Sequence, residues 1–158
     1  MYMRPSRENS TDIENNMRNL VYHLERAVVS TSTNTNGALE KINIVIDYKG
    51  FTLSKAPPMK ATMCTLEILQ SHYCERLHRA YMCNTPAIFN VFWRMVKHLI
   101  DPNTREKIVF CSAPEARDLV LKEQPDLSQL EKCAFGLLRT EDFNPREYLE
   151  EIPFNQSY

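Results

Sequence analysis

Apolar residues recur at helical spacing in two stretches of the first half of the chain. The first stretch follows Ser10–Asp12, which suits a helix N-cap, and stops before a Ser-, Thr- and Asn-rich run at 30–36, which predicts a linker. Its apolar positions are Ile13, Met17, Leu20, Val21, Leu24, Ala27 and Val28. The second helix is introduced by Pro57 and Pro58. Its expected inner face consists of Met59, Met63, Leu66 and Leu69.

Short apolar runs between helical patterns predict buried strands. The strands are expected at 41–47, near 80–83 and at 107–111. Further helices are expected at 86–100, near 114–123 and, as short segments, near 128–132 and 145–151. Strands that alternate with helices favour right-handed crossovers, so we predict an α/β fold with a mostly parallel sheet flanked by helices.

The helix predicted at 86–100 has more apolar residues than one buried stripe requires. Pro86 suits its first turn, and Asp101-Pro102 stops it. Its apolar arc spans roughly 200°, against about 100° for an ordinary surface helix. One half can pack on a sheet while the other faces more protein or an apolar ligand such as an acyl chain. Periodicity alone favours the simpler alternative, a well-buried core helix.

Composition and charge exclude several classes of protein. The 158 residues are 43% hydrophobic and 25% charged, which fits one globular domain, and the net charge of −1 gives no field that favours nucleic acid. The five cysteines lack C-x-x-C spacing and the four histidines are scattered, so neither a disulfide scaffold nor a metal site is indicated. Without a signal core or an apolar span, we expect a cytoplasmic protein that visits membrane surfaces peripherally.

The strongest catalytic alternative is a cysteine phosphatase. Cys111 and Arg117 have the C-x₅-R spacing after a predicted strand, where a loop can hold phosphate beside a thiolate. However, the intervening residues include no glycine, Pro114 has no N–H and Glu115 adds negative charge. No nucleophile elbow or phosphate-binding glycine loop occurs in a chain with three glycines. A non-catalytic function is therefore expected.

Six short pieces of the sequence carry a more specific signal together than any one does alone. They are, in order, Asp47–Gly50, Gln70–Tyr73, Tyr73–Leu77, Asn84–Pro86, Phe92–Lys97 and Asp101–Lys107. In this order and at this spacing they resemble the CRAL-TRIO domain of the phosphatidylinositol and phosphatidylcholine transfer proteins. The resemblance implies an apolar pocket over the sheet, holding one lipid beneath a mobile gate helix, here 86–100. The gate and acyl-pocket residues would be Phe89, Phe92, Trp93, Val96 and Ile100.

The resemblance also implies a headgroup site at Glu75, Thr104 and Lys107. Family members that bind phosphatidylinositol use the Glu of a Tyr-Pro-Glu-Arg stretch and the Thr and Lys of an Asp-Pro-x-Thr-x-x-Lys stretch. Lys supplies charge and donors to a phosphate, Thr a hydroxyl, and Glu acceptors for inositol hydroxyls. Two solvated surface charges are the structural alternative for Glu75 and Lys107. The implied function is phospholipid binding and transfer between membranes, most specifically of phosphatidylinositol, with no cofactor.

Several positions depart from the family pattern. Ile42 and Ile44 stand where proteins that also bind phosphatidylcholine have small hydroxyl residues, which argues against phosphatidylcholine binding. Cys74 replaces the usual Pro beside Glu75. Phe135–Leu137 has one Gly where the family often has two, so we expect that loop to differ.

The N-terminal sequence affects the expected domain organisation. Met1–Pro5 resembles the end of the first family strand. We therefore expect residues 1–158 to form a single CRAL-TRIO domain without the usual N-terminal helical domain and the first part of the fold. A lipid-free protein-interaction module on the same fold is the alternative function.

Overall fold

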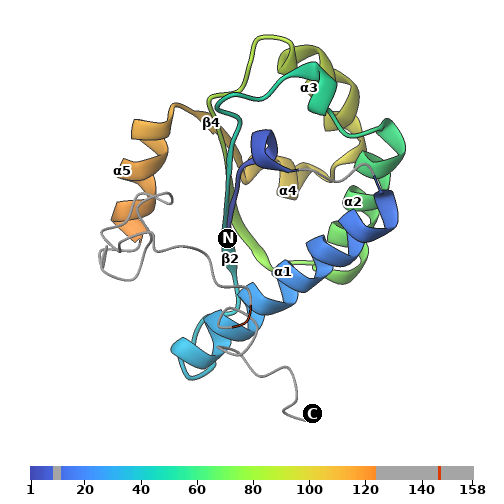
Figure 1. Ribbon diagram of the computed structural model, residues 1–158. Coiled ribbons are helices and arrows are strands. Elements are labelled where there is room, and N and C mark those ends of the chain that lie inside the picture. Colours follow the sequence, from blue (N-terminus) through green and yellow to red (C-terminus); the bar gives the residue numbers. More distant parts are fainter. Residues whose placement is uncertain (9–11, 124–145, 147–158) are drawn as a thin grey trace. The chain divides into compact units, whose positions relative to one another are not determined.

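The computed structural model describes residues 1–8, 12–123 and 146 (Figure 1). The strands are β1 Tyr2–Met3, β2 Ile42–Asp47, β3 Leu77–Cys83 and β4 Ile108–Cys111. The α-helices are α1 Ile13–Asn34, α2 Met59–His72, α3 Phe89–Val96, α4 Pro102–Glu106 and α5 Ala113–Glu123, and the 3₁₀ turns are η1 Pro5–Arg7, η2 Leu53–Lys55 and η3 Lys97–Leu99. The chain divides into two compact units, 1–116 and 117–158, and the four strands and α1–α4 all belong to the first.

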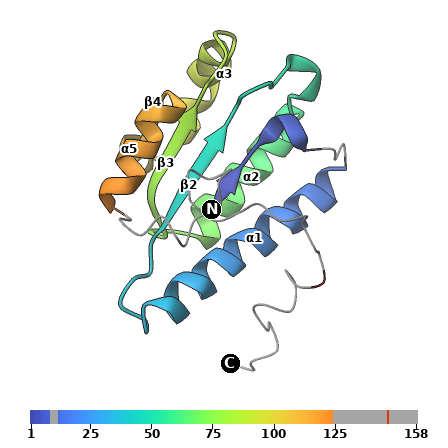
Figure 2. The same cartoon turned by 60° about the vertical axis from the view of Figure 1, so that its left-hand side comes forward.

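The four strands lie side by side in the order β1-β2-β3-β4, and every neighbouring pair is parallel (Figure 2). This confirms the expected α/β class. The register aligns Asp47, Cys83 and Cys111 in one row at the carboxyl ends of β2, β3 and β4. The prediction for β3 was too short, because this strand begins at Leu77.

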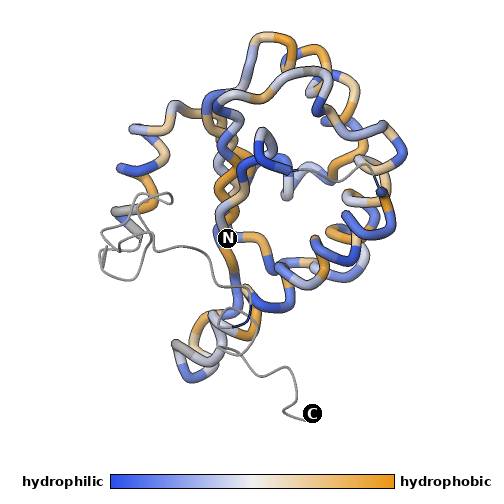
Figure 3. Tube along the Cα trace, in the orientation of Figure 1, coloured by the Kyte–Doolittle hydropathy of each residue, from blue (hydrophilic) through white to orange (hydrophobic). Residues whose placement is uncertain are grey.

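The core lies between the sheet and α1 and α2. Its most buried members are Leu24, Ile42, Ile44 and Ala80. Successive strand residues point to opposite faces, so Ile42 and Ile44 share the face that α1 covers. Leu20 and Ala27 of α1 and Leu69 of α2 pack against this cluster. The apolar side predicted for the first helix is therefore the side that packs on the strands, along which hydrophobic residues concentrate (Figure 3).

α1 begins as predicted and ends later than predicted. The Asp12 carboxylate accepts hydrogen bonds from the amides of Glu14 and Asn15, at 2.9 and 3.3 Å. The linker expected at 30–36 is wrong, because the helix continues to Asn34. The Thr31 hydroxyl donates to the Ala27 carbonyl at 2.8 Å, so it is satisfied within the helix and does not compete with it.

The inner face of α2 differs from the prediction. Met59 and Met63 are 45% and 43% exposed, whereas Ala61 is buried. The other two predicted inner-face residues, Leu66 and Leu69, are half-buried, and Leu69 packs against the core cluster. The Thr65 hydroxyl contacts the Met17 sulfur of α1 at 3.8 Å. α2 thus packs against a second helix as well as the sheet, which turns its buried side away from the two methionines.

The helix predicted at 86–100 is divided in the structure. The Phe89 amide donates to the Pro86 carbonyl at 2.8 Å in a turn, α3 proper starts at Phe89, and its last part is the 3₁₀ turn η3. None of the described helices has the length and apolar character that crossing a bilayer requires. The helices expected near 128–132 and 145–151 and the loop at 135–137 lie outside the described residues, apart from Arg146.

Candidate functional site

Glu75 and Lys107 meet at the amino-terminal edge of the sheet. Glu75 lies two residues before β3, and Lys107 lies directly before β4. Because β3 and β4 are parallel neighbours, their amino ends lie at the same edge. The Ala80 amide of β3 donates to the Lys107 carbonyl at 2.9 Å, and the Lys107 ammonium lies 3.4 Å from the Glu75 carboxylate.

The turn that carries Glu75 has an unusual backbone. Glu75 has φ of 60°, in the left-handed region that few non-glycine residues adopt. The Arg76 amide donates to the Tyr73 carbonyl at 3.2 Å, and the Cys74 thiol donates to the Gln70 carbonyl. Cys74, in place of the usual Pro, thereby ties the turn to the end of α2. The Glu75 side chain is 75% exposed and that of Lys107 is 24% exposed.

Thr104 is positioned by a capped single-turn helix. Asp101 caps α4 by accepting the amides of Asn103 and Thr104 at 2.9 and 3.1 Å. A side-chain hydrogen bond from Thr104, these amides and the charge of Lys107 hold the pKa of Asp101 below its usual range. The Lys107 amide donates to the Thr104 carbonyl at 3.1 Å, so both predicted residues belong to one small structural unit.

Sequence reasoning missed Asp101 and Gln70 as supports of this unit. The Asp101 amide donates to the Gln70 side chain at 3.3 Å, which links the end of α2 to the start of α4. In the sequence, Asp101-Pro102 predicts the stop of one helix and belongs to the Asp101–Lys107 piece, and neither role predicts a cap. Asp before Pro is also the signature of a helix start, with Asp at the N-cap and Pro at the first helical position, and it could have revealed the cap.

The five predicted gate residues lie on the inward side of α3 and of the residues that follow it. Phe89, Val96 and Ile100 are buried, and Phe92 and Trp93 are half-buried. The Phe89 ring lies 5.0 Å from the ring of Tyr48 and 5.3 Å from that of Phe92, between ring centroids. The rings of Trp93 and Phe110 of β4 form a T-shaped contact, with 5.1 Å between their centroids. These aromatic contacts join α3 to the sheet and to the turn after β2.

The other apolar residues of the same segment are exposed. They follow one side at helical spacing, and they are Ile88, Val91, Met95 and Leu99, with exposures of 44%, 48%, 55% and 45%. We call this set the outer stripe. The broad apolar arc seen in the sequence is therefore divided between a packed side and an uncovered side. Arg94 and His98 are also exposed in this segment.

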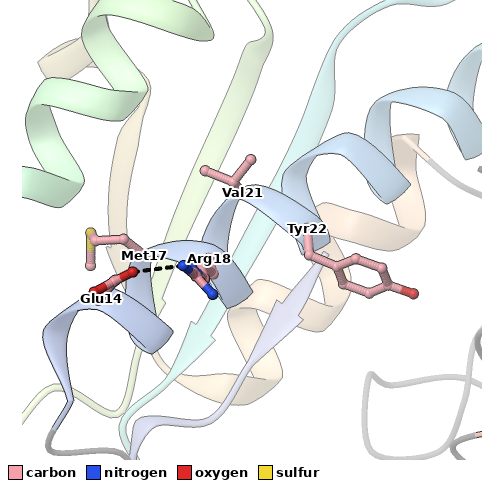
Figure 4. A pocket seen from close by; sticks show the side chains of 5 residues that line it. All are labelled: Glu14, Met17, Arg18, Val21 and Tyr22. Atoms are coloured by element: carbon pink, nitrogen blue, oxygen red, sulfur yellow. Dashed lines mark hydrogen bonds and ion pairs between the residues drawn. The ribbon is translucent and has the colours of Figure 1, made fainter.

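A shallow hollow is present elsewhere, along α1 (Figure 4). It is lined by Glu14, Met17, Arg18, Val21 and Tyr22. The Glu14–Arg18 ion pair, at 2.7 Å, lies within it. None of the predicted headgroup or gate residues lines it, and a hollow formed by a single helix offers little enclosure for a ligand.

The geometry around Cys111 does not favour the phosphatase alternative. The Ser112 amide and hydroxyl donate to the Glu115 carboxylate at 2.7 and 2.9 Å, and the Glu115 amide donates to the Ser112 hydroxyl at 3.4 Å. This reciprocal capping box fills an amide position that a phosphate would need. Burial raises the pKa of the Cys111 thiol, whereas the catalytic cysteine of a phosphatase must be ionised at neutral pH.

Comparison with known protein families shows which family this chain belongs to. The family model described as the CRAL/TRIO domain matches residues 1–136. The chain belongs to the CRAL/TRIO domain family. The "Phosphatidylinositol transfer protein PDR17" of Saccharomyces cerevisiae is 30% identical over 142 residues, which are 87% of this chain and 37% of that protein. The "SEC14 cytosolic factor" of Kluyveromyces lactis is 29% identical over 120 residues, 73% of this chain and 40% of that protein.

This CRAL/TRIO domain matches only part of its relatives. The "CRAL-TRIO domain-containing protein C23B6.04c" of Schizosaccharomyces pombe is 34% identical over 110 residues, which are 70% of this chain and 10% of that protein. Among solved structures, that of Sfh5 is 27% identical and covers 45% of this chain and 26% of that chain, with a TM-score of 0.42. The chain thus spans well under half the length of these relatives.

Proposed function

We propose that this domain binds a phospholipid, with phosphatidylinositol as the favoured class, and transfers or presents it at a membrane surface. The observation that carries the proposal is the meeting of Glu75 and Lys107 at 3.4 Å, at the amino ends of two neighbouring strands, with Thr104 one turn before Lys107. Membership of a lipid-binding family and the 30% identity to a protein named as a phosphatidylinositol transfer protein support it.

The two charged side chains suit two different parts of one headgroup. An ammonium group supplies donors to a phosphate, and a carboxylate accepts from ring hydroxyls. The two side chains form an ion pair in which Glu75 is 75% exposed, so solvent screens the pair and it is worth about 0–1 kcal/mol. A ligand that binds both residues must replace this pair. A ligand with both a phosphate and adjacent hydroxyls satisfies both residues, whereas a free phosphate satisfies Lys107 alone.

The strand next to β3 supports selectivity against phosphatidylcholine. Ile42 and Ile44 are 4% and 9% exposed and belong to the apolar cluster beneath α1. They offer neither a hydroxyl nor room for a polar headgroup. Discrimination would then arise because a choline phosphate finds no donor on β2, while an inositol phosphate uses residues at the strand edge.

The outer stripe gives the domain a means of contacting the bilayer. Four apolar side chains on one side, with Arg94 and Lys97 in the same segment, are typical of a helix that lies in a membrane interface. The packed side, with Phe89 and Trp93, would then meet the acyl chains when α3 moves away from the sheet. This would make α3 the gate.

Substituting Lys107 tests the headgroup assignment. Lys107→Ala should lower phosphatidylinositol transfer between liposomes about tenfold or more, since a hydrogen bond to a charged group contributes ~1.5–3 kcal/mol. Lys60→Ala, which removes an exposed lysine of α2, is the matched control and should transfer like the wild type. A folded Lys107→Ala protein that transfers at the wild-type rate would refute the assignment.

Native mass spectrometry of the purified protein distinguishes lipid binding from the interaction-module alternative. A bound phospholipid at a one-to-one ratio, identified as phosphatidylinositol after extraction, supports the proposal. A protein that carries no lipid and acquires none from phosphatidylinositol liposomes would favour the lipid-free module.

A further inference from the structure

Two thiols lie side by side on neighbouring strands, away from the headgroup site. Cys83 is the last residue of β3 and Cys111 the last of β4, and the register pairs them directly. Their sulfur atoms are 3.9 Å apart. Successive strand residues point to opposite faces, so Cys83 and Cys111 lie on the other face of the sheet from their neighbours Met82 and Phe110. The contact between Trp93 and Phe110 is therefore on the opposite face from the two thiols. The proposed lipid function uses neither thiol.

The two thiols differ in their access to solvent. Cys83 is fully buried, whereas Cys111 is partly exposed. Burial, followed by the adjacent Cys111 and Asp47, raises the pKa of Cys83 to about 12. The pKa of Cys111 is also raised, mainly by burial, while its hydrogen bond with Cys83 acts in the opposite direction. A dissolved oxidant would therefore react first with Cys111, and the buried Cys83 would be the adjacent thiol.

We propose that Cys83 and Cys111 form a dithiol site that a hydroperoxide converts reversibly to a disulfide. Because burial raises the pKa of the Cys111 thiol, the reaction proceeds through a small ionised fraction at neutral pH and is faster in alkaline buffer. The Cys111 thiolate sulfur attacks one oxygen of hydrogen peroxide, and the O–O bond breaks. Cys111 becomes a sulfenic acid, and the other oxygen leaves as hydroxide, which takes up the proton that the thiol released and becomes water. The Cys83 sulfur then displaces the sulfenic oxygen, which leaves as a second water. Overall, the two thiols lose two electrons and two protons, and one hydrogen peroxide is reduced to two waters.

The strand geometry permits the bond. Parallel neighbours lie about 4.8 Å apart, within the 4.4–6.8 Å that disulfides require between Cα atoms. The sulfurs must approach from 3.9 Å to about 2 Å. β4 is paired on one side only among the described strands, so it can shift toward β3.

The bond would enclose a defined part of the chain. Residues 84–110 lie between the two cysteines and include α3, η3 and α4 together with Thr104 and Lys107. Oxidation would close this segment into a covalent ring. Closing a ring reduces the conformational freedom of the unfolded chain, so the oxidised protein should melt at a higher temperature than the reduced one.

The test uses the full chain with Cys64, Cys74 and Cys133 replaced by Ser, so that the pair supplies the remaining thiols. Treatment with hydrogen peroxide in mildly alkaline buffer should remove both titratable thiols and lower the intact mass by two hydrogen atoms. Protease digestion without reductant should yield one cross-linked peptide containing both cysteines, and dithiothreitol should restore the thiols. In the wild-type protein the same cross-linked peptide should form, which keeps the test valid if the triple variant folds poorly.

Single substitutions identify the role of each thiol. Cys83→Ala in the same background should leave Cys111 as a trappable sulfenic acid with no disulfide in the monomer, whereas Cys111→Ser should leave Cys83 largely unreacted. Stable sulfinic or sulfonic acid on Cys111 without a cross-link to Cys83 would overturn the proposal. So would cross-links that form only between molecules.

Discussion

α1 covers the sheet with one apolar stripe, whereas the segment around α3 carries two. In α1, Leu24 is buried, Leu20 and Ala27 pack against the same cluster, and none of the large apolar side chains described in that helix is highly exposed. In the α3 segment Phe89 and Val96 are buried, while the outer stripe is about half exposed. Apolar residues of the same types therefore pack against the core in α1, whereas in the α3 segment some of them form an exposed surface.

The difference shows what burial explains and what it does not. α1 follows from the hydrophobic effect, because its apolar stripe matches the area that the sheet offers. The outer stripe leaves about half of each of its four side chains exposed among the described residues. Contiguous apolar surface of this kind marks an interaction site in soluble proteins. The proposed gate role of α3 accounts for this exposed surface. We therefore expect mutations in α1 and in the outer stripe to have different effects.

The largest expected difference is in folding stability. Leu24→Ala should lower the free energy of unfolding by about 2–5 kcal/mol, because it removes buried methyl groups and leaves a cavity. Met95→Ala should change it by less than about 0.5 kcal/mol, since its side chain is 55% exposed. Urea unfolding followed by circular dichroism measures both. Equal losses would mean that the outer stripe is part of the core and would remove the contrast between the helices.

A smaller effect is expected on membrane binding. The double variant Val91→Ser/Met95→Ser should bind anionic liposomes about tenfold or more weakly, at about 1 kcal/mol for each apolar side chain withdrawn from the interface. Met63→Ser on α2 is the control, because that methionine is similarly exposed and lies on another helix. Liposome co-sedimentation measures the affinities. An equal loss of liposome affinity in both proteins would show that any exposed apolar residue contributes to binding, wherever it lies. The outer stripe would then not be the membrane-contacting surface.

The smallest effect is spectroscopic. Trp93 is the single tryptophan of the chain, and its indole packs on Phe110. If α3 leaves the sheet at a bilayer, its emission should shift to the blue or change in intensity when anionic liposomes are added. Added salt should reduce the response, because Arg94 and Lys97 would be screened from the lipid headgroups. An unchanged spectrum in a protein shown by sedimentation to be bound would exclude movement of α3.

The sequence predicted those features that depend on local pattern or on strand direction. Alternating periods were sufficient for the α/β class. The family resemblance, not the periodicity, grouped Glu75 with Lys107, and the parallel strands explain how the two meet although 32 residues separate them. The packed side of α1 also followed from spacing. In these cases the spacing of the apolar residues was compatible with a single arrangement of the helix or strand.

The remaining features depend on contacts that one segment cannot reveal. The Ser and Thr run after residue 29 is helical up to Asn34, and the Thr31 hydroxyl donates to the Ala27 carbonyl of the same helix. Met59 and Met63 became exposed because α2 packs on α1 as well as on the sheet. The Cys83–Cys111 pair depends on strand register, which a single sequence does not display.

The left-handed backbone at Glu75 places two demands on one residue. For a non-glycine residue this conformation costs roughly 1–2 kcal/mol, a cost that glycine would avoid. Glycine would also remove the carboxylate that faces Lys107. Selection for thermal stability alone would therefore favour loss of the acid, whereas selection for headgroup binding would retain it. In a library of variants sorted separately for heat resistance and for lipid uptake, position 75 is where the two sorted populations should diverge most clearly.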